Sequence, residues 1–114
     1  MKIPEDGYLL RIYLGESDRW GHQPLYEAIV LKAREAGLAG ATVLRGVMAF
    51  GANSRVHTTK IVRLSEDLPL IIEIVDARDK IDAFLPQIDA MVKEGLATLE
   101  PVHVLFYRHD SPPA

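Results

Sequence analysis

The sequence predicts a single α+β domain in which two helices cover one face of an antiparallel sheet. Short stretches with the period of a strand and two stretches with the period of a helix follow each other in the order β-α-β-β-α-β. With 114 residues, 48% of them hydrophobic, the chain is long enough for one small core. We expect one domain over residues 1–114, with loose tails at 1–6 and 109–114.

The first strand and the first helix are predicted over 8–14 and 24–37. Leu10, Ile12 and Leu14 share one face of the strand, and turn-forming residues follow over 15–21. Pro24 suits the first turn of a helix, because the N–H that it lacks would have no partner there, and Gly37 ends the helix. Leu31 falls on the polar side of this helix and points to a subunit contact. The inward side of the helix is predicted to consist of Leu25, Ala28, Ile29, Ala33 and Ala36.

The middle of the chain carries three further stretches with strand character. A strand is predicted over 41–50, and the loop 51–59 follows it. The next stretch, 60–64, alternates charged with apolar residues and predicts an exposed strand or a hairpin arm, which ends in a turn over 65–69. The β-branched run 70–75 predicts a buried strand.

The second helix and the last strand complete the pattern. Asp76 is predicted to cap the helix, and Pro86 to kink or split it near Leu85, because proline removes a backbone donor and crowds the preceding turn. Gly95 is predicted to end the helix, and a strand follows over 97–107, with Pro101 at an edge or a bulge. The apolar residues at helical spacing are Ile81, Phe84, Leu85, Ile88 and Val92.

This order of elements is that of ferredoxin-like folds, in which two helices cover one face of an antiparallel sheet. The other face needs a cover too, because the strands carry apolar residues on both sides. Burial of this second face between subunits is the simplest solution, so we expect a homo-oligomer. The apolar residues expected to be divided between the two sides of the sheet are Tyr13, Val43, Val47 or their neighbours, together with Ile72 and Ile74.

Charge and cysteine content exclude several classes of protein. A net charge of −3 and a pI near 5.8 argue against a surface for nucleic acid or anionic membranes. The absence of cysteine excludes disulfides, thiolate metal sites and cysteine nucleophiles, and fits a reducing compartment. No stretch approaches the ~20 apolar residues of a membrane span, and residues 1–7 do not form a signal peptide. We expect a cytoplasmic protein that binds no nucleic acid and does not insert into a membrane.

The stretch 40–57 concentrates residues suited to ligand binding. Gly46 and Gly51 allow the backbone to approach a ligand closely, and the polar side chains around them suit an anion or a nucleotide. For Arg45, an ion pair with an acidic residue of a neighbouring strand or subunit is an equal alternative to a ligand contact. The predicted ligand-binding residues are Arg45, Gly46, Phe50, Gly51, Asn53, Ser54, Arg55 and His57.

Several motifs together resemble one known family. They are the segments 10–16 (LRIYLGE), 24–29 (PLYEAI), 36–46 (AGLAGATVLRG), 50–51 (FG), 54–57 (SRVH) and 64–69 (LSEDLP). This set is similar to the PII-like "domain of unknown function 190" family, and the likeness covers nearly the whole chain. The resemblance implies a homotrimer with a ligand cleft between neighbouring subunits, and it implies no established reaction.

The resemblance also suggests a role for the loop. In PII proteins the loop after the second strand is a mobile effector loop, and nucleotides bind in the cleft between subunits. By position, 51–59 lies at the base of that loop. Residues 94–98 lack the glycine-rich, lysine-bearing turn that holds phosphates in typical PII proteins, so a smaller nucleotide, AMP or ADP, is favoured over ATP. Arg45, Arg55, His57 and the backbone at Gly46 and Gly51 would hold its phosphate or base.

These observations favour a non-enzymatic regulator that senses a small anionic ligand and acts on an unknown target. A membrane transporter is one candidate target, because members of the resembled family are often encoded near a fluoride-exporting channel. Two alternatives stay open: a metal-responsive trimeric module of the same fold, and a hydrolase that uses Ser54 and His57. The histidines are scattered, and no nucleophile elbow surrounds Ser54. Trp20 and Tyr26 either pack or line a cleft.

Overall fold

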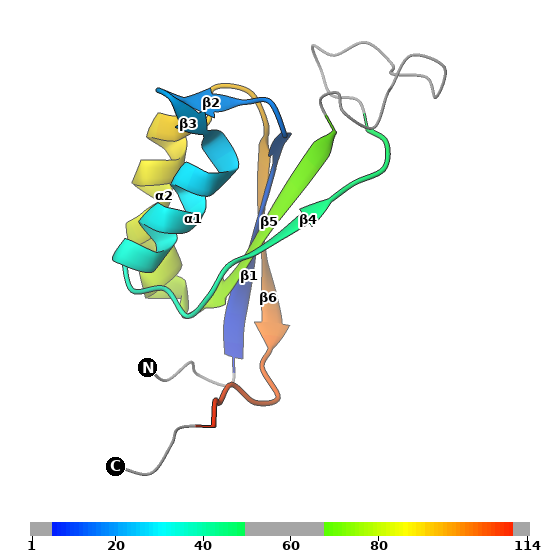
Figure 1. The fold of residues 1–114 in the computed structure, drawn as a ribbon. Helices are drawn as coiled ribbons and strands as arrows, with labels where there is room; N and C mark the ends of the chain where they lie inside the picture. The colour runs from blue at the N-terminus through cyan, green and yellow to red at the C-terminus, as the bar shows by residue number, and fades with distance from the viewer. Residues whose placement is uncertain (1–5, 50–67, 111–114) are drawn as a thin grey trace.

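A computed structural model describes residues 6–49 and 68–110. Its main sheet has the antiparallel strand order β4-β5-β1-β6, and both helices lie on one face of it (Figure 1). This arrangement confirms the predicted α+β, ferredoxin-like fold. The elements are β1 (Asp6–Gly15), β2 (Arg19–Trp20), β3 (Gln23–Pro24), α1 (Leu25–Glu35), β4 (Thr42–Arg45), β5 (Pro69–Asp76), α2 (Arg78–Met91) and β6 (Leu96–His103).

The core lies between the two central strands and the helices. Alternate residues of β1 and β5 point toward the helices, and the register places Ile12 opposite Ile72 and Leu10 opposite Ile74. From the helices, Ile29, Ile81 and Phe84 fill the same space and are almost fully buried. Burial of each such side chain stabilises the fold by about 1.5–3 kcal/mol. The predicted inward face of 8–14 is therefore confirmed. Ile72, Ile74 and Val43, which were expected to help form the second apolar face, all lie on the helix side, so their strand neighbours form that second face.

The other face of the main sheet carries the alternate residues of the same strands, and we call it the open face. Across its middle, Arg11 donates to Glu73 on β5 at 2.9 Å and to Glu100 on β6 at 2.8 Å. These two carboxylates raise the pKa of Arg11, chiefly through the hydrogen bond to Glu73. Leu44 and Leu96 belong to the same face and are exposed. Among residues 6–49 and 68–110, no element of one copy forms a layer over this apolar and charged sheet surface.

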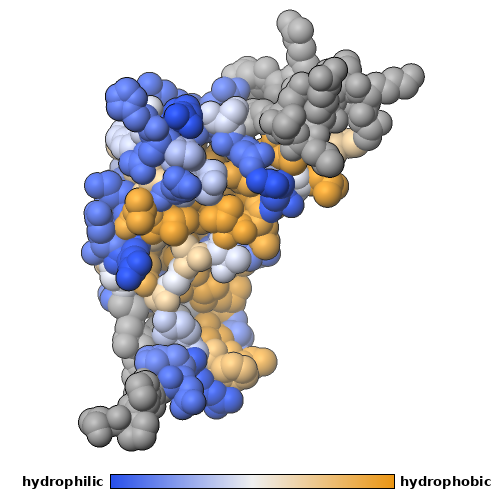
Figure 2. Space-filling view, viewed as in Figure 1, coloured by the Kyte–Doolittle hydropathy of each residue, from blue (hydrophilic) through white to orange (hydrophobic). Residues whose placement is uncertain are grey.

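The helix α1 begins and ends close to the predicted positions. Pro24 is its extended N-cap, and Gly37 adopts a φ of +76° just after its end. Four of the five predicted inward residues are buried, whereas Ala36 is exposed because the helix has already ended at Glu35. Leu31 is exposed, as predicted, and Figure 2 shows apolar surface gathered between α1 and β4.

The helix α2 is continuous, so the predicted split near Leu85 is wrong. Pro86 and Asp82 are both exposed, so the Asp82 carbonyl that loses its backbone donor can bind water instead. The buried Phe84 and Ile88, on either side of the proline, hold the two turns against the sheet. The helix also ends at Met91, earlier than predicted, because Val92 is already extended.

Asp76 has a different role from the predicted cap of α2. Ala77 is the N-cap, and its own side chain makes no capping hydrogen bond. The Asp76 side chain is fully buried and accepts hydrogen bonds from the backbone N–H of Ala77 at 2.7 Å and of Ala39 at 2.9 Å. It therefore ties the α1–β4 connection to the start of α2.

Two predicted strands are longer than the observed ones. The strand predicted over 41–50 is only Thr42–Arg45, and the one predicted over 97–107 is Leu96–His103. Pro101 lies in the edge strand β6, where a missing N–H is tolerated. Of the predicted tail 1–6, Asp6 already pairs within β1. The predicted arm 60–64 lies outside the described residues. Within the described part of the chain, no helix is long and apolar enough to cross a membrane.

Candidate functional site

The two described residues of the predicted ligand set lie at the end of β4. Arg45 is the last residue of that strand and forms an ion pair with Glu16, which follows β1. The alternative structural role for Arg45 is therefore observed. The Arg45 side chain remains 59% exposed, so an anionic ligand could reach it, but that ligand would compete with the Glu16 carboxylate.

Gly46 has a packing role. Its N–H donates to the Pro69 carbonyl at 2.7 Å, so this amide is not open to a ligand, contrary to the prediction. A Cβ at this position would lie 2.8 Å from Cγ of Pro69, which is closer than real Cβ contacts. The glycine lets β4 and β5 approach closely, and the sequence alone could not separate that need from ligand binding.

The other predicted ligand residues lie outside the described ranges: Phe50, Gly51, Asn53, Ser54, Arg55 and His57. The structure does describe what flanks them. Leu68 is buried, and its carbonyl accepts from the Glu16 N–H at 2.8 Å. The bonds Arg45–Glu16, Gly46–Pro69 and Glu16–Leu68 therefore fix both flanks of residues 50–67 beside the end of β1. We call this set of bonds the root of the 50–67 segment.

The turn between β1 and α1 forms a small hairpin that sequence reasoning missed. The Asp18 side-chain carboxylate accepts a hydrogen bond from the Gly15 N–H at 3.0 Å. The backbone carbonyl of Asp18 accepts a second one from the Leu25 N–H at 2.8 Å. Gly21 takes a φ of +62° at the tip between β2 and β3. The available signal was Gly21 between two polar stretches, but strands of two residues are too short for a periodic pattern.

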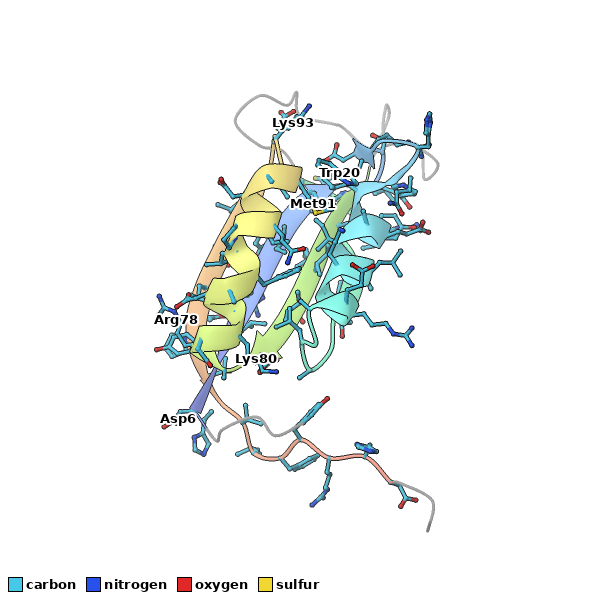
Figure 3. All side chains as sticks on the ribbon, turned by 90° about the vertical axis from the view of Figure 1, so that its left-hand side faces the viewer. Asp6, Trp20, Arg78, Lys80, Met91 and Lys93 are labelled. Atoms are coloured by element: carbon cyan, nitrogen blue, oxygen red, sulfur yellow. The ribbon has the colours of Figure 1, made fainter. Side chains whose placement is uncertain are left out.

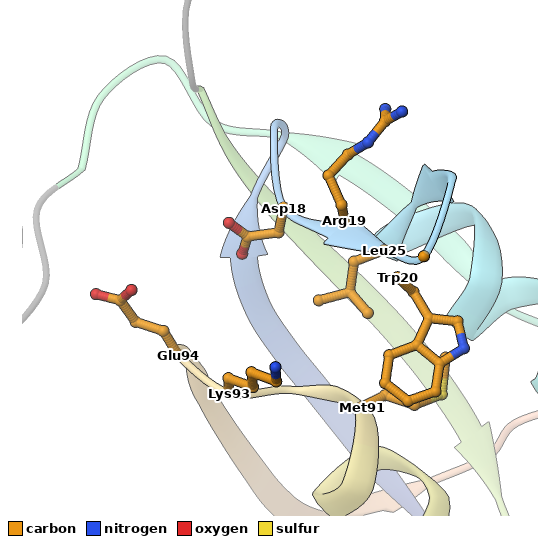
Figure 4. A pocket seen from close by; sticks show the side chains of 8 residues that line it. Asp18, Arg19, Trp20, Leu25, Met91, Lys93 and Glu94 are labelled. Atoms are coloured by element: carbon orange, nitrogen blue, oxygen red, sulfur yellow. The ribbon is translucent and has the colours of Figure 1, made fainter.

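This hairpin and the end of α2 enclose a cavity of about 340 Å³ (Figure 4). Trp20 and Met91 supply apolar surface, and charged groups of both signs surround them. Trp20 and Lys93 lie at the same end of the molecule, opposite Asp6 and Arg78 (Figure 3). The cavity is lined by Asp18, Arg19, Trp20, Gly21, Leu25, Met91, Lys93 and Glu94. Trp20 thus lines a cleft, and Tyr26 packs against the core.

The connection after α2 has its own steric requirement. A Cβ on Gly95 would lie 2.5 Å from the Tyr13 carbonyl oxygen, so only glycine fits beside β1 here. Among the residues that the structure describes, no group of three or more His, Asp or Glu side chains could hold a metal ion. His103 faces Asp6 at 3.4 Å.

Solved structures of a PII-like protein have the same fold. The structure of CPII from Thiomonas intermedia K12 bound to ADP and bicarbonate matches with a TM-score of 0.62 and 16% identity, over 87% of this chain and 88% of that one. CPII bound to ADP, AMP and bicarbonate, described as a nitrogen regulatory PII-like protein, matches with a TM-score of 0.63 at the same identity and coverage. At this identity the match demonstrates a shared fold.

Sequence relatives are considerably more similar. The UPF0166 protein of Aquifex aeolicus (strain VF5) is 37% identical over 98 residues, which cover 86% of this chain and 92% of the relative. A UPF0166 protein of Methanocaldococcus jannaschii is 36% identical over 97 residues, which cover 84% and 89%. The model of the domain of unknown function 190 family, described as "Uncharacterized ACR, COG1993", matches residues 7–104. The chain therefore belongs to that family, as its motifs indicated.

Proposed function

We propose that this protein is a non-enzymatic, cytoplasmic regulator of the PII-like kind, which binds AMP or ADP between subunits and acts on a target protein. The carrying observation is the root of the 50–67 segment, where an exposed arginine and its carboxylate partner meet both flanks of that segment. The fold is shared with CPII, whose structures hold ADP and AMP. The negative net charge of this chain favours a local anion site over a broad basic surface.

The ligand competes with Glu16 for Arg45 in this proposal. A phosphate offers several charged oxygens to the guanidinium, whereas Glu16 offers one carboxylate, so a bound nucleotide displaces Glu16. Because the Glu16 N–H also bonds the Leu68 carbonyl, a shift at Glu16 is transmitted to the start of β5. Nucleotide binding thereby changes the shape of the 50–67 segment and its contact with the target.

The open face of the sheet supports self-association in this proposal, and the number of three subunits comes from the family resemblance. Leu44, Leu96 and the Arg11 ion-pair network lie on a face that both helices leave uncovered. Packing of three such faces together would bury the apolar residues and shield the network from water. A membrane transporter remains a candidate target that the proposal does not require.

Nucleotide binding to matched variants tests the proposal. Isothermal titration calorimetry with AMP, ADP and ATP should give saturable binding of AMP or ADP to the wild type. Arg45→Ala should weaken this binding by about tenfold or more, because it removes a charge-assisted bond worth about 1.5–3 kcal/mol. Glu16→Gln should strengthen it, because the competing charge is lost.

Arg34→Ala is the matched control, because it removes an exposed arginine of α1 and should leave the affinity unchanged. Absence of binding by all three nucleotides at millimolar concentration would refute the nucleotide ligand. Equal affinities in Arg45→Ala and wild type would place the anion elsewhere. Neither the metal-responsive module nor the hydrolase gains support from a described residue, so neither is advanced as a second function.

A further inference from the structure

The short segment that follows β6 displays apolar side chains although it is held at two points. Val104 lies against Gly7 of β1, because a Cβ added to Gly7 would be 3.2 Å from Cγ2 of Val104. The Tyr107 hydroxyl donates to the Ala39 carbonyl at 2.6 Å. Between these two anchors, Leu105 is 82% exposed and Phe106 is 68% exposed. Adjacent large apolar side chains displayed in this way are typical of an interaction surface.

A complementary hollow lies on another part of the molecule. Between α1 and β4 there is a groove of about 260 Å³, lined by Tyr26, Glu27, Val30, Leu31 and Val43. All of its lining residues except Glu27 are apolar or aromatic, and Leu31 is 51% exposed. Figure 2 shows apolar surface in this region. The groove therefore suits an apolar side chain that has a positively charged group next to it, because that group can pair with Glu27.

We propose that Leu105 and Phe106 of one copy of this chain insert into the α1–β4 groove of a second copy. The Arg108 guanidinium lies 4.4 Å from the centroid of the Phe106 ring, so the cation accompanies the ring. Within the described part of the chain, Glu27 forms no ion pair. A phenyl ring seated in the groove would bring Arg108 to this carboxylate, which makes the two surfaces complementary in charge as well as in apolarity.

The anchors explain why the occupant is a second copy. Val104 on Gly7 and Tyr107 on Ala39 hold the segment below the end of β6, and with both anchors in place Leu105 and Phe106 stay exposed in their own chain. A contact between two different surfaces of identical chains is heterologous, and such contacts form a ring when the rotation between neighbouring copies closes. The inference thus rests on the proposed homotrimer. Two side chains bury far less than a stable interface of roughly 1,200 Å² or more, so this contact adds to burial of the open face.

Engineered cysteines can test the contact directly, because the chain contains no cysteine of its own. Leu31→Cys and Phe106→Cys chains, differently tagged and refolded together, should form a disulfide-linked mixed dimer under mild oxidation. Gln87→Cys, at an exposed position of α2, replaces Leu31→Cys in the control mixture. Yield of the mixed dimer should exceed the control severalfold. Equal yields in the two mixtures would overturn the proposal, as would purely intrachain linkage in a chain that carries both Leu31→Cys and Phe106→Cys.

Charge reversal provides a second measurement that does not depend on cysteine geometry. In sedimentation equilibrium, Glu27→Arg and Arg108→Glu should each weaken self-association, and the double variant should restore it. If the double variant self-associates no more strongly than the single variants, the pairing of Glu27 with Arg108 is contradicted. The mass of the wild-type assembly and its nucleotide binding are measured separately. A nucleotide-binding trimer without the specific cross-link would reject this contact and leave the proposed function intact, whereas a wild-type monomer would reject the trimer itself.

Discussion

Removal of the buried carboxylate of Asp76 should strongly destabilise the fold. In Asp76→Ala two backbone N–H groups, those of Ala39 and Ala77, lose their acceptor. Hydrogen bonds to a charged group are worth about 1.5–3 kcal/mol each, so the upper estimate is about 6 kcal/mol. Ala39 and Ala77 are half-buried, so their N–H groups can reach some water after the change. We therefore expect a loss of about 3 kcal/mol in the free energy of unfolding, a large part of the 5–15 kcal/mol typical of a domain.

Urea denaturation, followed by circular dichroism at a fixed protomer concentration, measures this loss. Asp76→Asn should cost less, because its amide keeps one acceptor oxygen. Asp82→Ala is the control: it removes an exposed carboxylate that pairs with Arg78 on the surface of α2, and should cost about 0.5 kcal/mol or less. A loss below about 1 kcal/mol in Asp76→Ala, or one no larger than in Asp82→Ala, would refute the role assigned to Asp76.

Two further predictions concern the root of the 50–67 segment and the open face. Gly46→Ala should lower stability by about 1–3 kcal/mol, because the added methyl meets the Pro69 ring. Thermal unfolding should show this loss but almost none in Gly40→Ala, whose added methyl meets no atom within 4 Å; equal melting temperatures would contradict the steric reason. Arg11→Ala leaves two carboxylates facing each other on the open face, and sedimentation velocity should show dissociation toward monomers that high salt partly reverses. Arg78→Ala, on α2, should leave the assembly intact, and an undisturbed assembly in Arg11→Ala would argue against burial of the open face.

The sequence pattern was sufficient for elements with a strong period. Alternation in 8–14 and the β-branched run 70–75 identified the two central strands, because both lie against the same helical layer and their inward residues must be apolar. Helical spacing likewise found Ile81, Phe84 and Ile88 of α2, but it missed the buried Met91. It failed at Pro86, because the cost of a missing hydrogen bond depends on whether the freed carbonyl reaches water, and local sequence does not record that exposure.

At the candidate site, too, some features could be predicted from the sequence and others could not. Arg45 and Gly46 were predicted as ligand residues from residue types alone, and the family was identified from motifs spread along the chain. Their partners could not be predicted, because Glu16 is 29 residues from Arg45 and Pro69 is 23 residues beyond Gly46, and only the sheet brings these residues together. The prediction of an open Gly46 amide was wrong for this reason.

By itself, the sequence determined the fold class and most inward faces of strands and helices, because these depend on the periodic placement of apolar residues. It also determined the family, because the family's motifs are local runs of residues. Tertiary structure decided which polar groups are already paired, how residues 104–107 are held and where the α1–β4 groove lies. Those features depend on contacts between distant segments, such as Asp76 with Ala39 and Tyr107 with Ala39. Contacts of this kind form only when the sheet sets the distance and direction between side chains, and one-dimensional spacing does not encode that geometry.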